Sequence, residues 1–389
     1  MNVSSNFDGG NISVLSSDNS NAIRLEIIPD NQSEFFQWFY FRLTGARGVS
    51  CRIHIVNAGQ ATYPDGFRNY RVVYSYDRQT WLRHPTEFRD GILSIDFLAE
   101  HDSVYFSYFA PYSMERHHDL IARAACSGLT SLTRLGTTLD GQDLDLLTIQ
   151  DPASVTPGRP LKNCWFMARQ HPGETMAEWW MEGLLDCLLN PDDPLAGSLL
   201  EQCRFYVVPN MNPDGSRRGH LRCNAAGRNL NREWQNPSME YSPEVYLVKQ
   251  KMSETGVDFF MDIHGDESLP YCFIAGTEGL ADWNEDDQQA LDFFKNTLAG
   301  LNRDFQTEQG YGRKNPGEAN MGMSTSQTAS LHGCLAMTLE MPFKDTTATP
   351  DSEFGWSPER SRKLAYSCLQ TLQAFLDRPS LNSPWGTSD

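Results

Sequence analysis

Polar and apolar residues alternate along the first 112 residues of the chain. Ile23, Leu25 and Ile27 are separated by polar residues, and similar short apolar runs follow in EFFQWFYFRL, CRIHIVNAG, YRVVYSY, ILSIDF and SVYFSYF. A period of two places every second side chain on one face, which is typical of antiparallel β-strands. Seven or so short strands over residues 1–112 predict a small antiparallel β-sandwich domain, and no catalytic constellation is visible within it.

The period changes from two to that of a helix in APYSMERHHDLIARAAC. Ser113 is suited to cap this helix, and apolar residues recur on one of its faces. We therefore expect a linker helix over residues 113–129. The adjacent His117 and His118 point about 100° apart on a helix and cannot chelate one ion together. We expect both to lie on a solvated helix surface.

From residue 130 onward, strand-like and helix-like segments alternate. A hairpin is predicted around Asp140-Gly141, and buried strands are predicted for NCWFMAR, CRFYVVPN, VDFFMDIH, YCFIAG and CLAMTLEMPF. Helices are expected after Gly173, from the Ser242 cap to Gly256, and from Ser357. This alternation indicates an α/β domain over residues 130–378, followed by a C-terminal tail at residues 379–389.

Charge and composition exclude several classes of partner. The formal net charge is −18, which argues against binding to nucleic acid or to an anionic membrane. There is no run of 18 or more apolar residues, and the first residues resemble no export signal. The nine cysteines form no CxxC pair, which argues against a disulfide framework. We expect a cytoplasmic protein.

A first pair of metal-ligand candidates follows the predicted strand NCWFMAR. His171 and Glu174 stand three positions apart across a Pro-Gly turn, a spacing that can hold a metal ion but that also suits an ordinary helix start. His264 ends a second apolar run, at the same edge of the predicted sheet. Two histidines and one glutamate are a known catalytic zinc set. Taken alone, His264 would be read as a core histidine.

Glu340 lies near the end of a third apolar strand, before Pro342. A carboxylate on a buried strand is costly unless it pairs with a charge or acts as an acid or base. Beside a metal site it can take a proton during attack and return it to the leaving amine. A structural salt bridge is the alternative.

One stretch runs against the overall acidity. The six arginines Arg204, Arg217, Arg218, Arg222, Arg228 and Arg232 have only Asp214 among them, and the stretch PNMNPDGSRRGHLRCNAAGRNLNREW that holds five of them reads as a loop. We expect it to bring Arg222, Asn231 and Arg232 to one end of the sheet. Arginine suits a carboxylate or a developing oxyanion. Such a site would cleave an amide next to a free carboxylate.

Several motifs in combination resemble those of the zinc carboxypeptidase family of the carboxypeptidase A type. They are HPGE, NPDG, LNR, DIHG and LEMPF, and the N-terminal β domain resembles that of the cytosolic carboxypeptidase branch. The resemblance implies a mixed central sheet flanked by helices. It also implies one Zn²⁺ per chain, bound by His171, Glu174 and His264, with Glu340 as general base and acid. Arg222 would then polarise the scissile carbonyl, and Asn231 and Arg232 would hold the terminal carboxylate of the peptide or protein substrate.

The sequence departs from the family pattern at two places. Asn229 stands where the family usually has an aspartate that orients a zinc-binding histidine; its amide oxygen can still accept the histidine N–H, but without the charge. No aromatic stands in a recognisable family motif for covering the substrate, and the candidate for this role is Tyr311, in a Gly-rich stretch that reads as a mobile loop. Arg313 and Lys314 nearby would suit acidic chain ends, although nothing in the sequence fixes the side-chain pocket.

Two other functions stay open at this point. A zinc deacylase of N-acyl amino acids, similar to aspartoacylase, would keep the metal site and change the substrate. A non-catalytic peptide-binding module would have lost its zinc ligands, and the intact set of two histidines and two glutamates counts against it. The sequence does not determine the oligomeric state.

Overall fold

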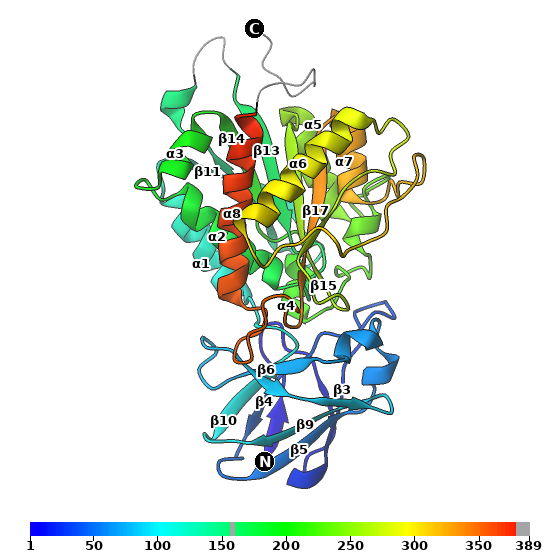
Figure 1. The fold of residues 1–389 in the computed structure, drawn as a ribbon. Coiled ribbons are helices and arrows are strands. Elements are labelled where there is room, and N and C mark those ends of the chain that lie inside the picture. The colour runs from blue at the N-terminus through cyan, green and yellow to red at the C-terminus, as the bar shows by residue number, and fades with distance from the viewer. Residues whose placement is uncertain (156–159, 379–389) are drawn as a thin grey trace.

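The computed structural model describes residues 1–155 and 160–378. Its N-terminal part contains two five-stranded sheets (Figure 1). In one sheet, every pairing is antiparallel. In the other, the single parallel pair is β3 with β5, because the chain visits β4 of the first sheet between them. The first sheet has the order β1 (Asn2–Ser4), β4 (Tyr40–Thr44), β10 (Ser103–Ser107), β6 (Arg71–Ser75), β7 (Leu82–Pro85), and the second β2 (Ser13–Ser16), β3 (Ile23–Glu26), β5 (Ser50–Ile55), β9 (Ile92–Leu98), β8 (Glu87–Arg89).

These two sheets pack face to face as a sandwich. Ile23 and Leu25 of β3 are fully buried while Arg24 between them is exposed, as the alternation predicted. Phe97 of β9 meets Phe106 of β10 across the interior, with ring centroids 5.0 Å apart. The sandwich has ten strands where about seven were expected, because several edge strands are only three or four residues long and carry little periodic signal.

The rest of the described chain is built on one seven-stranded mixed sheet. The predicted hairpin is present as β11 (Thr130–Thr137) and β12 (Asp143–Ile149). It forms one edge of the sheet, and the central strands run parallel. The predicted fold class is confirmed. The full order is β11, β12, β14 (Cys203–Val208), β13 (Lys162–Ala168), β15 (Phe259–Asp266), β17 (Leu335–Pro342), β16 (Phe273–Ala275).

Helices cover both faces of this sheet, so its strands are apolar throughout. Along β13, Cys164 and Phe166 belong to the core under one layer of helices, while Trp165 and Met167 belong to the core on the other side. Figure 1 shows α6 and α8 crossing one face. One layer contains α2 (Met176–Leu188), α6 (Glu285–Leu301) and α8 (Pro358–Leu376), and the other α5 (Pro243–Thr255) and α7 (Ser324–His332).

Helix ends with local signals were predicted well. Ser113 caps α1 (Met114–Ala125) by accepting a hydrogen bond from the Arg116 N–H, and Ser357 caps α8 in the same way. Gly256, with φ of +73°, follows α5. The helices α3 (Pro194–Leu200), α6 and α7 were not identified from the sequence. The predicted tail at residues 379–389 lies outside the described residues.

Two expectations were wrong. The stretch from Pro209 to Trp234 is not all loop, because it contains the helix α4 (Pro213–Arg218), which Asn212 caps by accepting a hydrogen bond from the Gly215 N–H at 3.0 Å. His117 does not lie on a solvated surface. It is buried, and its Nδ1 is 2.6 Å from the Glu178 carboxylate, which offsets the cost of burying a polar ring.

Candidate metal and active site

The turn after β13 brings the first two ligand candidates together. His171 and Glu174 are buried, and His171 Nδ1 lies 2.7 Å from Glu174 Oε1. Gly173 allows this turn because a Cβ there would meet the carbonyl oxygen of Leu221 at 3.0 Å. Arg169 holds the turn from the other side by donating from its guanidinium to the Pro172 carbonyl.

His264 joins this pair from the neighbouring strand β15. Its Nδ1 lies 2.8 Å from Glu174 Oε2 and 3.2 Å from His171 Nδ1. Ligand atoms of the three residues all lie within 4.8 Å of one another, and all three side chains are buried. Two imidazole nitrogens and a carboxylate oxygen facing one point are a donor set that zinc prefers, with room for a fourth ligand. The residues present therefore fit a zinc ion.

Electrostatics prepare two of these groups to bind a cation. Burial, and then the charge of Arg222, lower the pKa of His171 to about 4, so its ring is neutral at pH 7. Burial alone would raise the pKa of Glu174, but the two histidines hold it below its usual range. A neutral imidazole and an ionised carboxylate are the forms that bind a metal.

The far nitrogen of each histidine also faces a polar oxygen, through a hydrogen bond at His171 and an ion-pair contact at His264. Asn229 Oδ1 lies 3.0 Å from His171 Nε2, as expected for an amide that replaces a carboxylate. Asp262 Oδ2 lies 2.8 Å from His264 Nε2, and Gln170 and Ser324 donate hydrogen bonds to that same carboxylate oxygen. Such partners fix the orientation of a metal-binding ring. The sequence analysis missed Asp262, although a carboxylate inside the apolar run VDFFMDIH was a visible signal.

Glu340 comes from the next strand, β17, and lies directly opposite His264 in the parallel register. The residue is only 6% exposed. Its Oε1 accepts a hydrogen bond from the Tyr311 hydroxyl at 3.1 Å, and its Oε2 has no hydrogen-bond partner among the described residues. Burial raises the pKa of this carboxyl well above its usual range. No salt bridge accounts for Glu340 in the described part of the chain, so the structural alternative lacks support.

Tyr311 reaches the site, while its two basic neighbours in sequence do not. Asp266 Oδ2 also lies 2.8 Å from the Tyr311 hydroxyl, so the single hydroxyl hydrogen is shared between Glu340 and Asp266. The Tyr311 ring packs edge-on against Phe273. Arg313 and Lys314 are exposed and form no ion pair with any described residue. The structure thus places Tyr311 beside Glu340 and leaves Arg313 and Lys314 in solvent.

The three residues expected to bind the substrate occupy different environments. The Arg222 guanidinium lies 5.6 Å from the ring centre of Phe35 and 5.8 Å from that of Tyr63, both from the N-terminal sandwich. Asn231 is buried, and its Oδ1 accepts the Ser324 N–H at 2.9 Å. Arg232 is exposed and donates to the carbonyl of Asn231.

Comparison with known proteins identifies the family. The zinc carboxypeptidase family model matches residues 118–363, and that of the cytosolic carboxypeptidase N-terminal domain matches residues 3–109. This chain belongs to the zinc carboxypeptidase family. As a member, it is a metallocarboxypeptidase, in agreement with the donor set above. No helix within residues 1–155 and 160–378 is both long and apolar enough to cross a membrane.

Close relatives of this zinc carboxypeptidase come from several bacteria. An uncharacterised protein of Zymomonas mobilis is 49% identical over 97% of each chain. The crystal structure of a metallo-carboxypeptidase from Burkholderia cenocepacia is 45% identical, with a TM-score of 0.94 over 97% of this chain and 99% of that one. A metallo-carboxypeptidase from Pseudomonas aeruginosa, in complex with (2-guanidinoethylmercapto)succinic acid, is 41% identical, with a TM-score of 0.92 over 97% of this chain and 99% of that one.

Proposed function

We propose that this enzyme binds one Zn²⁺ through His171, Glu174 and His264 and hydrolyses the peptide bond next to a free C-terminal carboxylate. The observation that supports this proposal best is the position of Glu340, which is buried directly across the strand pair from His264. A base must lie within reach of the reacting water to act on it. If His171 and Glu174 only began a helix and His264 were only a core histidine, no buried carboxylate would be needed beside them.

A zinc ion held by His171, Glu174 and His264 would supply Lewis-acid polarisation to the water and the scissile carbonyl. Glu340 takes a proton from the attacking water at its free oxygen, Oε2, and returns it to the leaving amine. The pKa of Glu340, which burial raises, falls again when a cation is held by the neighbouring ligands. Tyr311 steadies the other oxygen of Glu340 through its hydroxyl.

Arg222, Asn231 and Arg232 would bind the polar parts of the substrate. Arg222 is the residue we assign to the scissile carbonyl. Burial alone would lower the pKa of its guanidinium, but Tyr63 and the carboxylates of Glu174, Glu267 and Glu340 outweigh burial and raise it, so the arginine stays charged. Asn231 and Arg232 would hold the terminal carboxylate, with Arg232 exposed for that contact.

The side-chain preference is the second part of the proposal. We infer a preference for C-terminal Glu or Asp, because the segment from Arg204 to Arg232 is basic in an acidic protein. Arg313 and Lys314, which follow Tyr311 in the sequence and are exposed, would meet the acidic chain end from the solvent side. The substrate would be a peptide or protein C-terminus, and nucleic acid and membranes would not be partners. Cysteines support a cytoplasmic location, since all nine are unpaired.

A substrate panel tests both parts of this proposal. The purified zinc form would be assayed on peptides ending in Glu, Asp, Leu, Lys or Arg, and on N-acetylated single amino acids. Cleavage of peptides that end in Glu or Asp, at least tenfold faster than the others, is the expected result. Peptides with basic ends are included because the ligand of the Pseudomonas aeruginosa relative carries a guanidino group. Equal or faster cleavage of these peptides would overturn the acidic preference. Hydrolysis of acyl amino acids alone would favour the deacylase.

Metal binding is tested separately from hydrolysis. The metal-free chain should take up one zinc per molecule, and zinc should raise its melting temperature because the ion binds only the folded state. His264→Ala should abolish both effects. His118→Ala is the matched control, since His118 is exposed on α1 and belongs to no ligand cluster of the described chain. Equal zinc uptake by the two variants would contradict the assigned site.

A further inference from the structure

One carboxylate of the N-terminal sandwich binds three consecutive backbone amides of the catalytic domain. Asp30, in the loop between β3 and β4, accepts the N–H of Leu221 at 2.7 Å through Oδ1. Its Oδ2 accepts the N–H groups of Arg222 at 2.7 Å and Cys223 at 2.8 Å. Asp30 is only 3% exposed, and its three acceptor contacts all end on the segment that carries Arg222.

The residue after Asp30 extends this contact. The Asn31 N–H donates to His220 Nε2 at 3.1 Å, and the Asn31 amide donates to the carbonyl of Ala225 at 2.7 Å. His220 in turn uses Nδ1 to reach the carbonyl of Cys223 at 2.8 Å. Both ends of the segment from His220 to Ala225 are therefore tied to the N-terminal sandwich.

The guanidinium of Arg222 has no such anchor of its own. It forms no side-chain hydrogen bond and no ion pair with any other described residue. It lies 5.6 Å from the ring centre of Phe35 and 5.8 Å from that of Tyr63, both of which belong to the N-terminal sandwich. Its N–H donors are thus uncommitted, and its position depends on its own backbone and on two aromatic neighbours.

We propose that Asp30 is a positioning residue for Arg222, so that the N-terminal sandwich completes the active centre. Asp30 fixes the backbone from which Arg222 extends, and Phe35 and Tyr63 limit where the guanidinium can go. This lets the arginine keep its donors for the substrate carbonyl. The inference rests on the role of Arg222 given under the proposed function, and small displacements of such a group are costly to catalysis.

Asp30→Asn is the decisive change. An amide has one acceptor oxygen where the carboxylate has two, so at least one of the three backbone N–H groups would face an NH2 group. Since Arg222 would act on the transition state, we expect kcat to fall roughly tenfold or more with little change in KM. Arg222→Met should lower kcat by roughly 100-fold or more.

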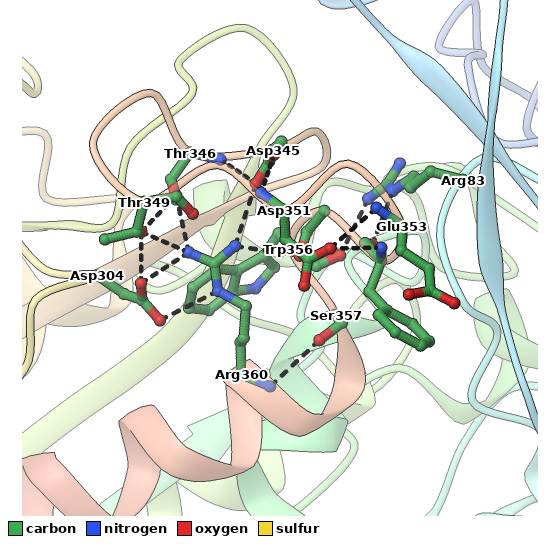
Figure 2. Close-up of polar contacts among 12 residues, drawn as sticks. Arg83, Asp304, Asp345, Thr346, Thr349, Asp351, Glu353, Trp356, Ser357 and Arg360 are labelled. Atoms are coloured by element: carbon green, nitrogen blue, oxygen red, sulfur yellow. Dashed lines mark hydrogen bonds and ion pairs between the residues drawn. The ribbon is translucent and has the colours of Figure 1, made fainter.

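A matched control separates positioning from simple attachment of the two domains. Arg83 is also buried in the sandwich and also binds the backbone of the catalytic domain. It donates to the carbonyls of Phe343, Phe354 and Trp356. Figure 2 shows Arg83 beside Glu353 and Trp356. Arg83→Met should lower the melting temperature at least as much as Asp30→Asn does, and it should leave kcat within about twofold of wild type.

A double-mutant cycle decides the proposal. If Asp30 acts through Arg222, Asp30→Asn should have less than about a twofold effect on kcat when Arg222 is already Met. An equal loss in both backgrounds, or wild-type kcat in the single variant, would overturn the inference while leaving the role of Arg222 intact. Full activity of Arg222→Met would instead overturn the proposed role of Arg222, and the inference with it.

A second variant keeps the test valid if Asp30→Asn does not fold. Phe35→Leu removes one ring beside the guanidinium and preserves an apolar side chain at a half-buried position. We expect a loss of kcat of roughly threefold to tenfold in the wild-type background and none in Arg222→Met. The same loss in both backgrounds would show that the ring does not act through Arg222, and would overturn the inference.

Discussion

His264 and Glu340 lie directly opposite each other on the parallel strands β15 and β17. His264 Nδ1 lies 2.8 Å from the Glu174 carboxylate. Glu340 Oε2 has no hydrogen-bond partner among the described residues. Because parallel strands end at the same edge of a sheet, this register brings a metal-ligand candidate and a base candidate together from positions 76 residues apart in the sequence.

The first prediction concerns the base. Glu340→Gln keeps the shape of the side chain and removes its ability to take a proton, so kcat should fall by roughly 100- to 10,000-fold. Zinc content, measured by atomic absorption, should stay at one per chain because Glu340 is not a ligand. If Glu340→Gln turned over a peptide ending in Glu at the wild-type rate, Glu340 would not be the general base.

A second prediction concerns the amide at Asn229. Asn229→Asp preserves both acceptor contacts, to His171 Nε2 and to the Asn231 N–H, and adds a negative charge next to the histidine. We expect zinc to bind roughly three to ten times more tightly, as measured by competition with a chelator. Asn190→Asp makes the same charge change at an exposed position and should leave zinc affinity unaltered. Equal effects of the two changes would show that only net charge matters.

The Tyr311 hydroxyl should influence the pH dependence. Its hydrogen bond favours the ionised form of Glu340 and so lowers the pKa of that carboxyl. Activity is lost as the pH falls through the pKa of the base. Tyr311→Phe should therefore move the acidic limb of the kcat/KM profile to higher pH, by roughly half a unit to one unit. Tyr366→Phe, on α8, is the control, and an unmoved limb in Tyr311→Phe would contradict the prediction.

A fourth prediction concerns stability away from the metal ligands. Burial raises the pKa of Glu244, in the first turn of α5, to about 8. The folded protein keeps this proton up to about pH 8, whereas the unfolded chain loses it at the lower, ordinary pKa of a glutamate. The contribution of Glu244 to the free energy of unfolding is therefore fully present below the unfolded pKa and is lost as the pH rises through about 8. Glu244→Gln lacks this titration, so relative to wild type it should gain roughly 2 to 4 kcal/mol in unfolding free energy between pH 5 and pH 9.

Urea unfolding at pH 5, 7 and 9 measures this difference. Glu240→Gln, at an exposed position just before α5, is the matched control and should show the same pH dependence as wild type. A Glu244→Gln curve parallel to that of wild type would show that Glu244 does not carry its proton into the folded state.

Local signals explain what could be predicted about the fold. Ser113, Ser357 and Gly256 mark helix ends because capping involves only neighbouring residues. The helix α4 was missed because the Asn-rich and Gly-rich stretch around it resembles a loop, although Asn212 followed by Pro213 is a helix start. The burial of His117 depends on Glu178, 61 residues further along the chain.

The sequence by itself determined the chemistry of this protein. Strand periodicity and turn residues are local signals, so the sequence alone located the candidate groups. These are the closely spaced His171 and Glu174, the strand-end residues His264 and Glu340, and the basic segment around Arg222. Only the tertiary structure decided which partners these groups have. Asp262 at His264, Tyr311 at Glu340 and Asp30 at the Arg222 segment are held there by long-range packing. Asp30 binds the backbone amides of Leu221 and Arg222, which are 191 and 192 positions further along the chain. No sequence period encodes a contact over such a separation, because only the fold brings those amides to one carboxylate.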